Sequence, residues 1–351
     1  MPLSLEGLIE KAQEKNASDI HIVSGLVPRY RVHGEILNIT DEIVTAEDCE
    51  HYAKALMGDI YATIAKCGEW DGAVEIAKTR CRLNIFCQRN GMSIAIRLLS
   101  SEIPVLSQLN LPAAIGKLPE LINGLVLVTG VTGSGKSTTL AAILDTINHS
   151  RRAHILTLED PIEYIYTPDQ CVINQREVGR DTESFPTGLR AALREDPDVI
   201  LIGELRDLGT IRTALTAAET GHLVFATLHT GTSADAIDRI VDVFPEGEQK
   251  QIRMQLSITL RAVISQKLLP VVQGDGRVAA CEIMIVTDAI RNLIREGKTP
   301  QIANAILTSG AEGSTTMDNS LIRLYKEKKI SGATAQLYAQ DVTYVKRNTL
   351  Y

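Results

Sequence analysis

The sequence predicts an α/β protein in which a parallel-sheet domain follows a smaller α+β domain. Three apolar runs, at 153–158, 198–203 and 223–228, are separated by stretches with helical spacing. Strands that alternate with helices favour a parallel sheet with right-handed crossovers. Before them, short runs of alternating polar and apolar residues and two amphipathic segments are typical of an α+β domain. The length of 351 residues also suggests two domains.

The expected domain boundary follows from a change of pattern near residue 100. Residues 100–115 contain two prolines and little hydrophobic periodicity, which is typical of a linker. We therefore expect an N-terminal domain at 1–99, a linker at 100–115, and a parallel-sheet domain with a C-terminal helical region at 116–351.

Charge and cysteine usage restrict the function classes. The chain carries 36 basic and 43 acidic residues, which argues against a dedicated nucleic-acid surface because such a surface needs clustered Lys and Arg. The six cysteines include no C-x-x-C pair, which favours reduced thiols over a disulfide framework or a zinc site. The sequence shows neither a signal peptide nor an apolar run of ~18–20 residues. We therefore predict a cytoplasmic protein with no transmembrane segment, which reaches a membrane only through a partner.

The segment 130–137, GVTGSGKS, fits the pattern G-x-x-x-x-G-K-[ST] at every fixed position. An apolar run at 124–129 precedes it, and apolar residues at helical spacing follow in 136–148. Strand, glycine-rich loop and helix are the context in which this pattern binds the phosphates of a nucleoside triphosphate. We expect Lys136 to reach the β- and γ-phosphates of ATP, and the Ser137 hydroxyl to bind Mg²⁺. The residues predicted to bind the nucleotide are Gly130, Thr132, Gly133, Ser134, Gly135, Lys136, Ser137 and Thr138.

Acidic residues follow two of the three apolar runs. Glu204 comes directly after the second run, and Glu159, Asp160 and Glu163 end the first. Because ligands of parallel sheets bind beyond the carboxyl ends of the strands, we expect these carboxylates at one edge. Transfer of a phosphoryl group to water needs a metal ion and a positioned water. Glu204 is the predicted Mg²⁺ ligand or water-positioning group, Glu159 a second candidate ligand and Glu163 an alternative base. The sequence leaves open which carboxylate is the base.

Two histidines flank the third apolar run, with His222 before it and His229 after it. Their separation of seven residues does not match the spacing of a local metal pair. A neutral imidazole that hydrogen-bonds the γ-phosphate or a neighbouring carboxylate is one role for either histidine. A structural histidine at a strand end is equally consistent with the residue type, and both residues stay candidates for catalysis.

Alternating runs on both sides of Asn90-Gly91 predict a β-hairpin, because this dipeptide is the strongest short hairpin signal. With Asn90 and Gly91 as the two turn residues, Asn84 faces Arg97. Arg82 then lies on the same face, diagonal to Arg97 and close enough to share an anion with it. From spacing alone, two solvated surface arginines are the favoured alternative.

Several segments resemble the secretion and type IV pilus ATPases. LEDPIEY at 158–164 resembles the Asp box of that family, DPDVILIGELRD at 196–207 its Walker B box, and TGHLVFATLHT at 220–230 its His box. NQREVGRDT at 174–182 also agrees, and AIRNLIREGK at 289–298 resembles the C-terminal signature of the pilus retraction ATPases. Together with the glycine-rich loop, the resemblance covers nearly the whole chain.

This resemblance implies a homohexameric ring whose subunits each have a PAS-like N-terminal domain and a RecA-like ATPase domain. It also implies that ATP binds between the two domains, and the two arginines of the family pattern fall on Arg82 and Arg97. The ring would lie at the cytoplasmic face of the inner membrane and act on the pilus platform protein. ATP hydrolysis would then withdraw pilins from the filament, which is pilus retraction and drives twitching motility.

Three other interpretations are weighed against a retraction motor. A paralogous accessory retraction ATPase, or a pilus assembly or secretion ATPase, has the same chemistry with another mechanical output. A nucleotide-gated regulator with little turnover is disfavoured by Glu204 beside a complete glycine-rich loop. A DNA helicase is disfavoured by the acidic charge balance.

Overall fold

The computed structural model describes residues 4–32, 34–62, 64, 68–99, 102–274 and 276–349. The chain divides into two compact units. The first unit comprises Met1–Glu102 and Pro161–Ile165, and the second comprises Ile103–Asp160 and Tyr166–Tyr351. None of the helices in the described part of the chain is long and apolar enough to cross a membrane.

An antiparallel sheet and two α-helices make up the first unit. Its elements in chain order are α1 (Leu5–Glu14), β1 (Asp19–Val23), β2 (Arg29–Val32), β3 (Glu35–Asn38), α2 (Ala46–Met57), the 3-10 helix η1 (Gly58–Ile60), β4 (Glu69–Ile76), β5 (Thr79–Gln88) and β6 (Gly91–Leu98). The strand order is β3-β2-β1-β6-β5-β4, and neighbours pair antiparallel. Side chains from both helices and from alternate strand positions share one apolar core. The predicted α+β character is confirmed.

The turn between β5 and β6 lies one residue earlier than predicted. Gln88 pairs with Gly91, so the two turn residues are Arg89 and Asn90, whereas the predicted turn residues are Asn90 and Gly91. The strands are therefore shifted by two residues relative to the prediction. An even shift keeps every side chain on its face of the sheet, so the alternation of apolar residues cannot distinguish the two registers.

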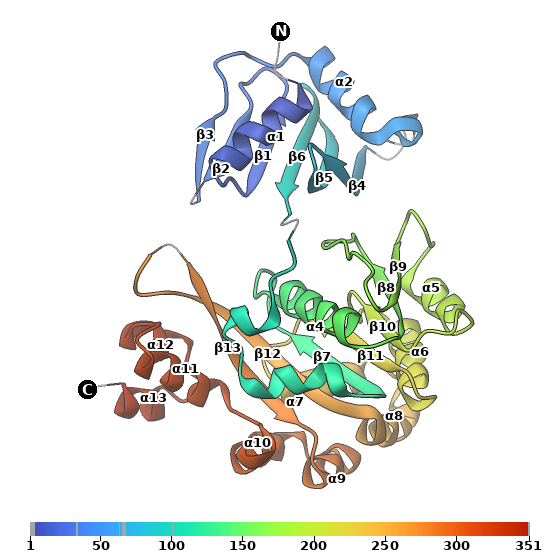
Figure 1. Ribbon diagram of the computed structural model, residues 1–351, viewed down its shortest axis with the longest axis vertical. Helices are drawn as coiled ribbons and strands as arrows, with labels where there is room; N and C mark the ends of the chain where they lie inside the picture. Colours follow the sequence, from blue (N-terminus) through green and yellow to red (C-terminus); the bar gives the residue numbers. More distant parts are fainter. Residues whose placement is uncertain are drawn as a thin grey trace. The chain divides into compact units, whose positions relative to one another are not determined.

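A mixed sheet forms the centre of the second unit (Figure 1). Its strands are β7 (Gly124–Thr129), β8 (His154–Glu159), β9 (Val172–Glu177), β10 (Val199–Ile202), β11 (Leu223–Leu228), β12 (Leu260–Pro270) and β13 (Arg277–Ile285). Their order is β13-β12-β7-β11-β10-β8-β9. Neighbours pair parallel, except β13, which runs antiparallel to β12. The predicted parallel sheet is confirmed for β7 to β12, whose carboxyl ends lie at one edge.

Helices pack against this sheet and continue into a C-terminal helical region (Figure 1). They are η2 (Leu106–Leu109), η3 (Ala113–Glu120), α4 (Lys136–Ser150), α5 (Phe185–Ala192), α6 (Leu208–Glu219), α7 (Ser233–Asp242), α8 (Glu246–Thr259), α9 (Asp288–Glu296), η4 (Thr299–Gln301), α10 (Ile302–Thr308), η5 (Gly310–Glu312), α11 (Met317–Lys326), α12 (Gly332–Tyr338) and α13 (Val342–Asn348). Helix α9 lies within the segment that resembles the retraction signature, and its Ile290 and Ile294 are buried. It ends at Gly297, whose φ of 68° is a common helix stop.

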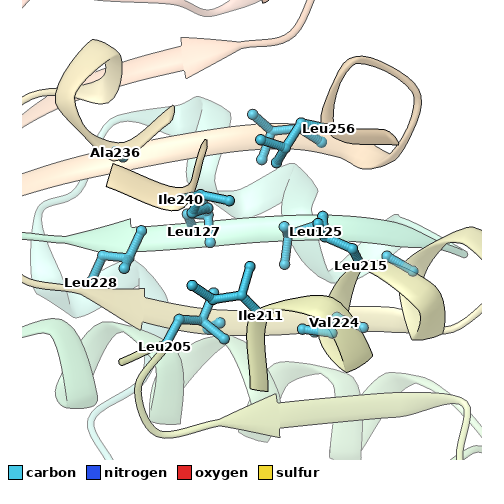
Figure 2. Packing of buried hydrophobic residues seen from close by; sticks show 14 of the residues in the cluster. Leu125, Leu127, Leu205, Ile211, Leu215, Val224, Leu228, Ala236, Ile240 and Leu256 are labelled. Carbon is cyan, nitrogen blue, oxygen red and sulfur yellow. The ribbon is translucent and has the colours of Figure 1, made fainter. Parts of the chain in front are cut away.

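An apolar cluster fixes β7 and β11 beneath the helices. In Figure 2, Leu125 and Leu127 of β7 and Val224 of β11 lie among side chains that include Ile211 of α6 and Ile240 of α7. Each of these five side chains is at most 1% exposed. Burying one such side chain contributes about 1.5–3 kcal/mol. The ends of these two strands are therefore rigid supports for the loops that follow them.

The segment predicted as a linker is mostly part of the second unit. Ser100 and Ser101 lie outside the described residues, and from Ile103 onward the chain belongs to the second unit. The 3-10 helices η2 and η3 pack on α4, and Ile115 is 1% exposed. Short 3-10 turns with prolines lack the period of an α-helix, which is why the sequence carried no sign of this packing.

Candidate active site

The loop between β7 and α4 curls because its glycines adopt positive φ angles. The angle φ is 144° at Gly130, 77° at Gly133 and 88° at Gly135, and side chains with a Cβ disfavour this region. Thr132 is exposed, whereas Ser134 is buried. Helix α4 begins directly after Gly135, so the N–H groups of its first turn are available to an anion. The predicted strand, loop and helix are confirmed.

Lys136, Ser137 and Thr138 form the first turn of α4. The ammonium nitrogen Nζ of Lys136 donates to the carbonyl oxygen of Gly130 at 2.8 Å and to that of Val131 at 3.1 Å. Only 9% of Lys136 is exposed, so its charge is held within the curve of the loop. The hydroxyl groups of Ser137 and Thr138 lie on the same turn, at the positive end of the helix dipole.

Glu204 follows β10, between the ends of β8 and β11. The N–H of Gly203 donates to the carbonyl of Leu158 at 2.8 Å, and the N–H of Leu205 donates to the carbonyl of Thr227 at 3.0 Å. These two backbone bonds fix the chain on both sides of Glu204. The side chain of Glu204 is 12% exposed, so its carboxylate is held in a partly desolvated position at the edge of the sheet.

Two basic side chains flank the carboxylate of Glu204. Arg206 forms an ion pair with it through Nε, and the Nε2 atom of His229 lies 3.7 Å from its Oε2 atom. Glu204 follows β10, His229 follows β11, and Lys136 follows the loop after β7. These strands are consecutive in the sheet, so three predicted site residues come from neighbouring strand ends.

The pKa of His229 reflects the same neighbours. Partial burial lowers the pKa of His229 below its ordinary value, and the positive charges of Lys136 and Arg206 lower it further, while the negative charge of Glu204 opposes the shift. The imidazole is therefore neutral at pH 7, with one nitrogen as a donor and the other as an acceptor.

Variants that change these charges should move the pKa of His229 in opposite directions. In Glu204→Gln the opposing negative charge is lost, so the pKa should fall; in Lys136→Ala a positive charge is lost, so it should rise. An NMR titration of the imidazole measures both shifts. His149 is an internal control, because its pKa is raised by the backbone carbonyl and the charge of Asp145 and should not move. An unchanged His229 pKa in both variants would contradict the proximity of these groups.

The two other candidate carboxylates have different settings. Glu159 ends β8, the strand beside β10. Its Oε1 atom accepts hydrogen bonds from Thr157 Oγ1 at 2.7 Å and from Gln175 Nε2 at 3.4 Å. Glu163 lies in Pro161–Ile165, which belongs to the first unit. Of these two carboxylates, Glu159 therefore lies at the same edge of the sheet as Glu204.

His222 lies at the opposite end of β11 from His229. The N–H of Gly124, the first residue of β7, donates to the carbonyl of His222 at 3.0 Å. The Nδ1 atom of its ring lies 3.0 Å from the carbonyl oxygen of Ala217 and 3.3 Å from Thr220 Oγ1. A strand of six residues separates the two histidines, which is roughly 20 Å. Of the two roles that the sequence left open for His222, these contacts fit the structural one, and the residue lies away from Glu204 and His229 within this chain.

Arg82 and Arg97 are direct partners across β5 and β6, rather than the diagonal pair predicted from the turn. The Nε atom of Arg97 donates to Asp19 Oδ1 at 2.9 Å, and the Arg97 side chain is 59% exposed. Partial burial raises the pKa of Asp19, but the hydrogen bonds from Ser18 and Arg97 outweigh it and hold the pKa below its ordinary value. Like charges directly opposite each other destabilise a strand pair, so an anion that bridges the arginines would be stabilising.

Two further residues that contact the predicted site residues were not among the candidates. Arg206 pairs with Glu204, and the only sign in the sequence is a basic residue two positions after the carboxylate. Gln266 of β12 contacts the glycine-rich loop. The signal for Gln266 in the sequence is an amide side chain within an apolar strand. An amide that is buried in such a strand needs hydrogen-bond partners nearby.

Comparison with known proteins gives a consistent set of similarities. A family model described as "Type II/IV secretion system protein" matches residues 2–336. The uncharacterized protein YggR of Escherichia coli (strain K12) is 49% identical, over 91% of this chain and 97% of its own length. The type IV pilus retractation ATPase PilT of Pseudomonas aeruginosa is 46% identical, over 95% of this chain and 97% of its own length. A crystal structure of the pilus retraction motor PilT with bound ADP is similar with a TM-score of 0.91 and 44% identity, and the match covers 98% of this chain and 99% of that one.

Proposed function

The chain belongs to the Type II/IV secretion system protein family, and we propose that it is a hexameric ATPase that powers the retraction of type IV pili. The observation that carries the proposal is the convergence of Lys136, Glu204 and His229 at neighbouring strand ends beside the glycine-rich loop. The relatives whose names refer to pilus retraction support the biological role.

The glycine-rich loop and the first turn of α4 would bind the nucleotide. Successive N–H groups of a curled glycine-rich loop and of a helix N-terminus bind phosphate oxygens. The ammonium group of Lys136, already inside the curve of the loop, adds a full positive charge to the β- and γ-phosphates. The adjacent hydroxyls of Ser137 and Thr138 complete a polar surface for the phosphate chain and its metal ion.

Glu204 is the residue that we assign to water activation. Its carboxylate would orient the attacking water and take its proton as the water oxygen bonds to the γ-phosphorus and ADP leaves. Arg206 holds the orientation of the carboxylate through their ion pair. A neutral His229, 3.7 Å away, would hydrogen-bond the carboxylate or the γ-phosphate without adding charge.

Three side chains that end or follow strands of this sheet carry oxygen donors of the kind that a magnesium ion binds. Mg²⁺ in nucleotide sites takes one or two protein oxygens together with phosphate oxygens and water. Ser137 provides a hydroxyl, Glu204 a carboxylate that is only 12% exposed, and Glu159 a second carboxylate on the neighbouring strand. When bound, the ion would neutralise charge that develops on the phosphates.

The mechanical part of the proposal concerns the assembly. Six copies would form a ring at the cytoplasmic face of the inner membrane and act on the platform protein of the pilus. Work on that platform would withdraw pilins from the base of the filament, so that ATP hydrolysis shortens the pilus and produces twitching motility. The similarity to proteins named for pilus retraction supports this output.

A phosphate-release assay and a gene deletion test the proposal together. The purified protein should release phosphate from ATP in steady state. Cells without the gene should be hyperpiliated and lose twitching motility, because filaments still grow but are not withdrawn, and the wild-type gene should restore motility. Bald cells would indicate an assembly ATPase instead. Phosphate release at background level would favour a nucleotide-gated regulator.

Removing one arginine of the β5–β6 pair should slow hydrolysis. Positive charge near the transferred phosphoryl group stabilises its transition state, so Arg82→Ala and Arg97→Ala should each lower kcat by about 10²-fold. Size-exclusion chromatography should still detect the assembled ring. Arg89→Ala in the turn of the same hairpin is the matched control and should keep wild-type kcat. A wild-type kcat in both arginine variants would show that Arg82 and Arg97 are surface residues without a role in hydrolysis.

A further inference from the structure

Gln266 lies behind the glycine-rich loop. It belongs to β12, which pairs with β7 as far as Ser265 and Thr129, so the next residue along β12 lies beside the start of the loop. Gln266 is 3% exposed. A primary amide buried to this extent is costly unless both its donor and its acceptor find partners.

The Gln266 amide has one partner in the glycine-rich loop and one in helix α4. The Nε2 atom donates to the carbonyl oxygen of Ser134 at 2.8 Å, and the Oε1 atom accepts from Thr139 Oγ1 at 2.9 Å. The orientation of the amide is fixed because only its NH₂ group can donate to a carbonyl. One side chain therefore ties the loop to helix α4.

This contact sets the direction of a loop N–H group. In a trans peptide the carbonyl and the following N–H point in opposite directions. Because Gln266 holds the Ser134 carbonyl toward β12, the N–H of Gly135 points away from β12. N–H groups of the loop that are aligned in this way are the ones that bind phosphate oxygens.

The same residue explains two of the glycines in the loop. A Cβ placed on Gly130 would lie 2.4 Å from the backbone oxygen of Gln266, and a Cβ placed on Gly135 would lie 2.8 Å from its Nε2 atom. The loop backbone is packed against Gln266 so closely that side chains cannot fit. A residue 132 positions later in the chain than Ser134 thus shapes the phosphate-binding loop.

We propose that Gln266 is a positioning residue for nucleotide binding, which acts by holding the Ser134 carbonyl so that the loop N–H groups face the phosphates. The inference rests on the proposed ATPase function. It predicts a loss of nucleotide affinity when the Nε2 donor is removed, even if the protein stays folded.

The test measures binding of a fluorescent ADP analogue in the presence of Mg²⁺, together with KM, kcat and Tm. In Gln266→Glu an acceptor of the same shape faces the Ser134 carbonyl, and in Gln266→Met the hydrogen-bonding groups are absent. Both variants should bind the analogue about tenfold more weakly or worse, because a buried carbonyl loses its donor. KM should rise by a similar factor while kcat at saturating ATP changes little, as expected for lost binding that is equal in ground and transition states.

Two control variants separate positioning from stability. Ser265→Ala removes the acceptor of a buried bond from Thr129 Oγ1 at 2.9 Å, one residue away on the same strand. It should lower Tm about as much as Gln266→Met while keeping nucleotide affinity. Thr139→Val leaves the Nε2 bond in place and should weaken binding by less than either Gln266 variant.

The results of this test distinguish a failure of the ATPase proposal from a failure of the role proposed for Gln266. A wild-type protein that does not bind the analogue would overturn the ATPase proposal and this inference with it. If the wild-type protein binds the analogue and both Gln266 variants bind it with the same affinity, this inference alone is overturned. An affinity loss in Ser265→Ala that matches the loss in Gln266→Met would also overturn it, because the effect would then be one of general stability.

Discussion

Replacing Lys136 with alanine should abolish ATP turnover and weaken nucleotide binding by about 10²-fold or more. Charge-assisted hydrogen bonds contribute about 1.5–3 kcal/mol each, and this ammonium group would make at least two of them to phosphate oxygens. The side chain is only 9% exposed, so its charge is poorly screened by water. Titration with a fluorescent ATP analogue and a phosphate-release assay measure the two effects.

The control for this variant has to separate lost charge from a disturbed loop. Lys136 also donates to the carbonyls of Gly130 and Val131, so Tm should be measured for Lys136→Ala and compared with that of wild type. Lys117→Ala, at an exposed lysine of η3, should leave binding, turnover and Tm unchanged. If Lys136→Ala binds the nucleotide with wild-type affinity, the assignment of this loop as the nucleotide-binding site is wrong.

Replacing Glu204 with glutamine should keep nucleotide binding and lower hydrolysis by ~10²-fold or more. The amide has the shape of the carboxylate but cannot take a proton from water or neutralise a metal ion. Its site supports a chemical role rather than a structural one, because the flanking backbone is fixed by Gly203 and Leu205 whichever side chain is present. In this variant, the affinity for the ATP analogue should therefore stay at the wild-type level, while single-turnover phosphate release should become slower.

Glu163→Gln is the informative comparison for Glu204→Gln. The sequence left open which carboxylate is the base, and the two residues belong to different units of the chain. If Glu204→Gln hydrolyses ATP at the wild-type rate and Glu163→Gln does not, the role of the base passes to Glu163. If only Glu204→Gln is slow, the carboxylate next to His229 is the one that activates water.

The opposite charge effects on His229 connect these two variants. Lys136 and Glu204 act on its pKa with opposite signs, so a titration of this imidazole reports on both groups in the absence of turnover. A variant that loses activity through unfolding would instead bring the pKa of both His229 and His149 to the ordinary imidazole value. The pKa shifts therefore distinguish a local change at the site from a general loss of structure.

Local patterns alone determined the chemistry of this protein. The loop at 130–137 depends on consecutive residues, because glycine torsions, the lysine and the helix start act within one short segment. Apolar strands followed by Glu204 and His229 predicted the edge of the sheet, since parallel strands all end there. Helix α9 also depends on local signals, because its apolar face and the glycine that stops it lie within one short segment.

Tertiary structure decided everything that depends on distant partners. The pairing of Arg82 with Arg97 required the register of the hairpin, and two registers satisfy the same alternation. The roles of His222 and His229 could not be separated until their places at opposite ends of β11 were known. Gln266 became visible only when β12 was found beside β7, because a buried amide is defined by the groups that surround it and the sequence does not contain those distances.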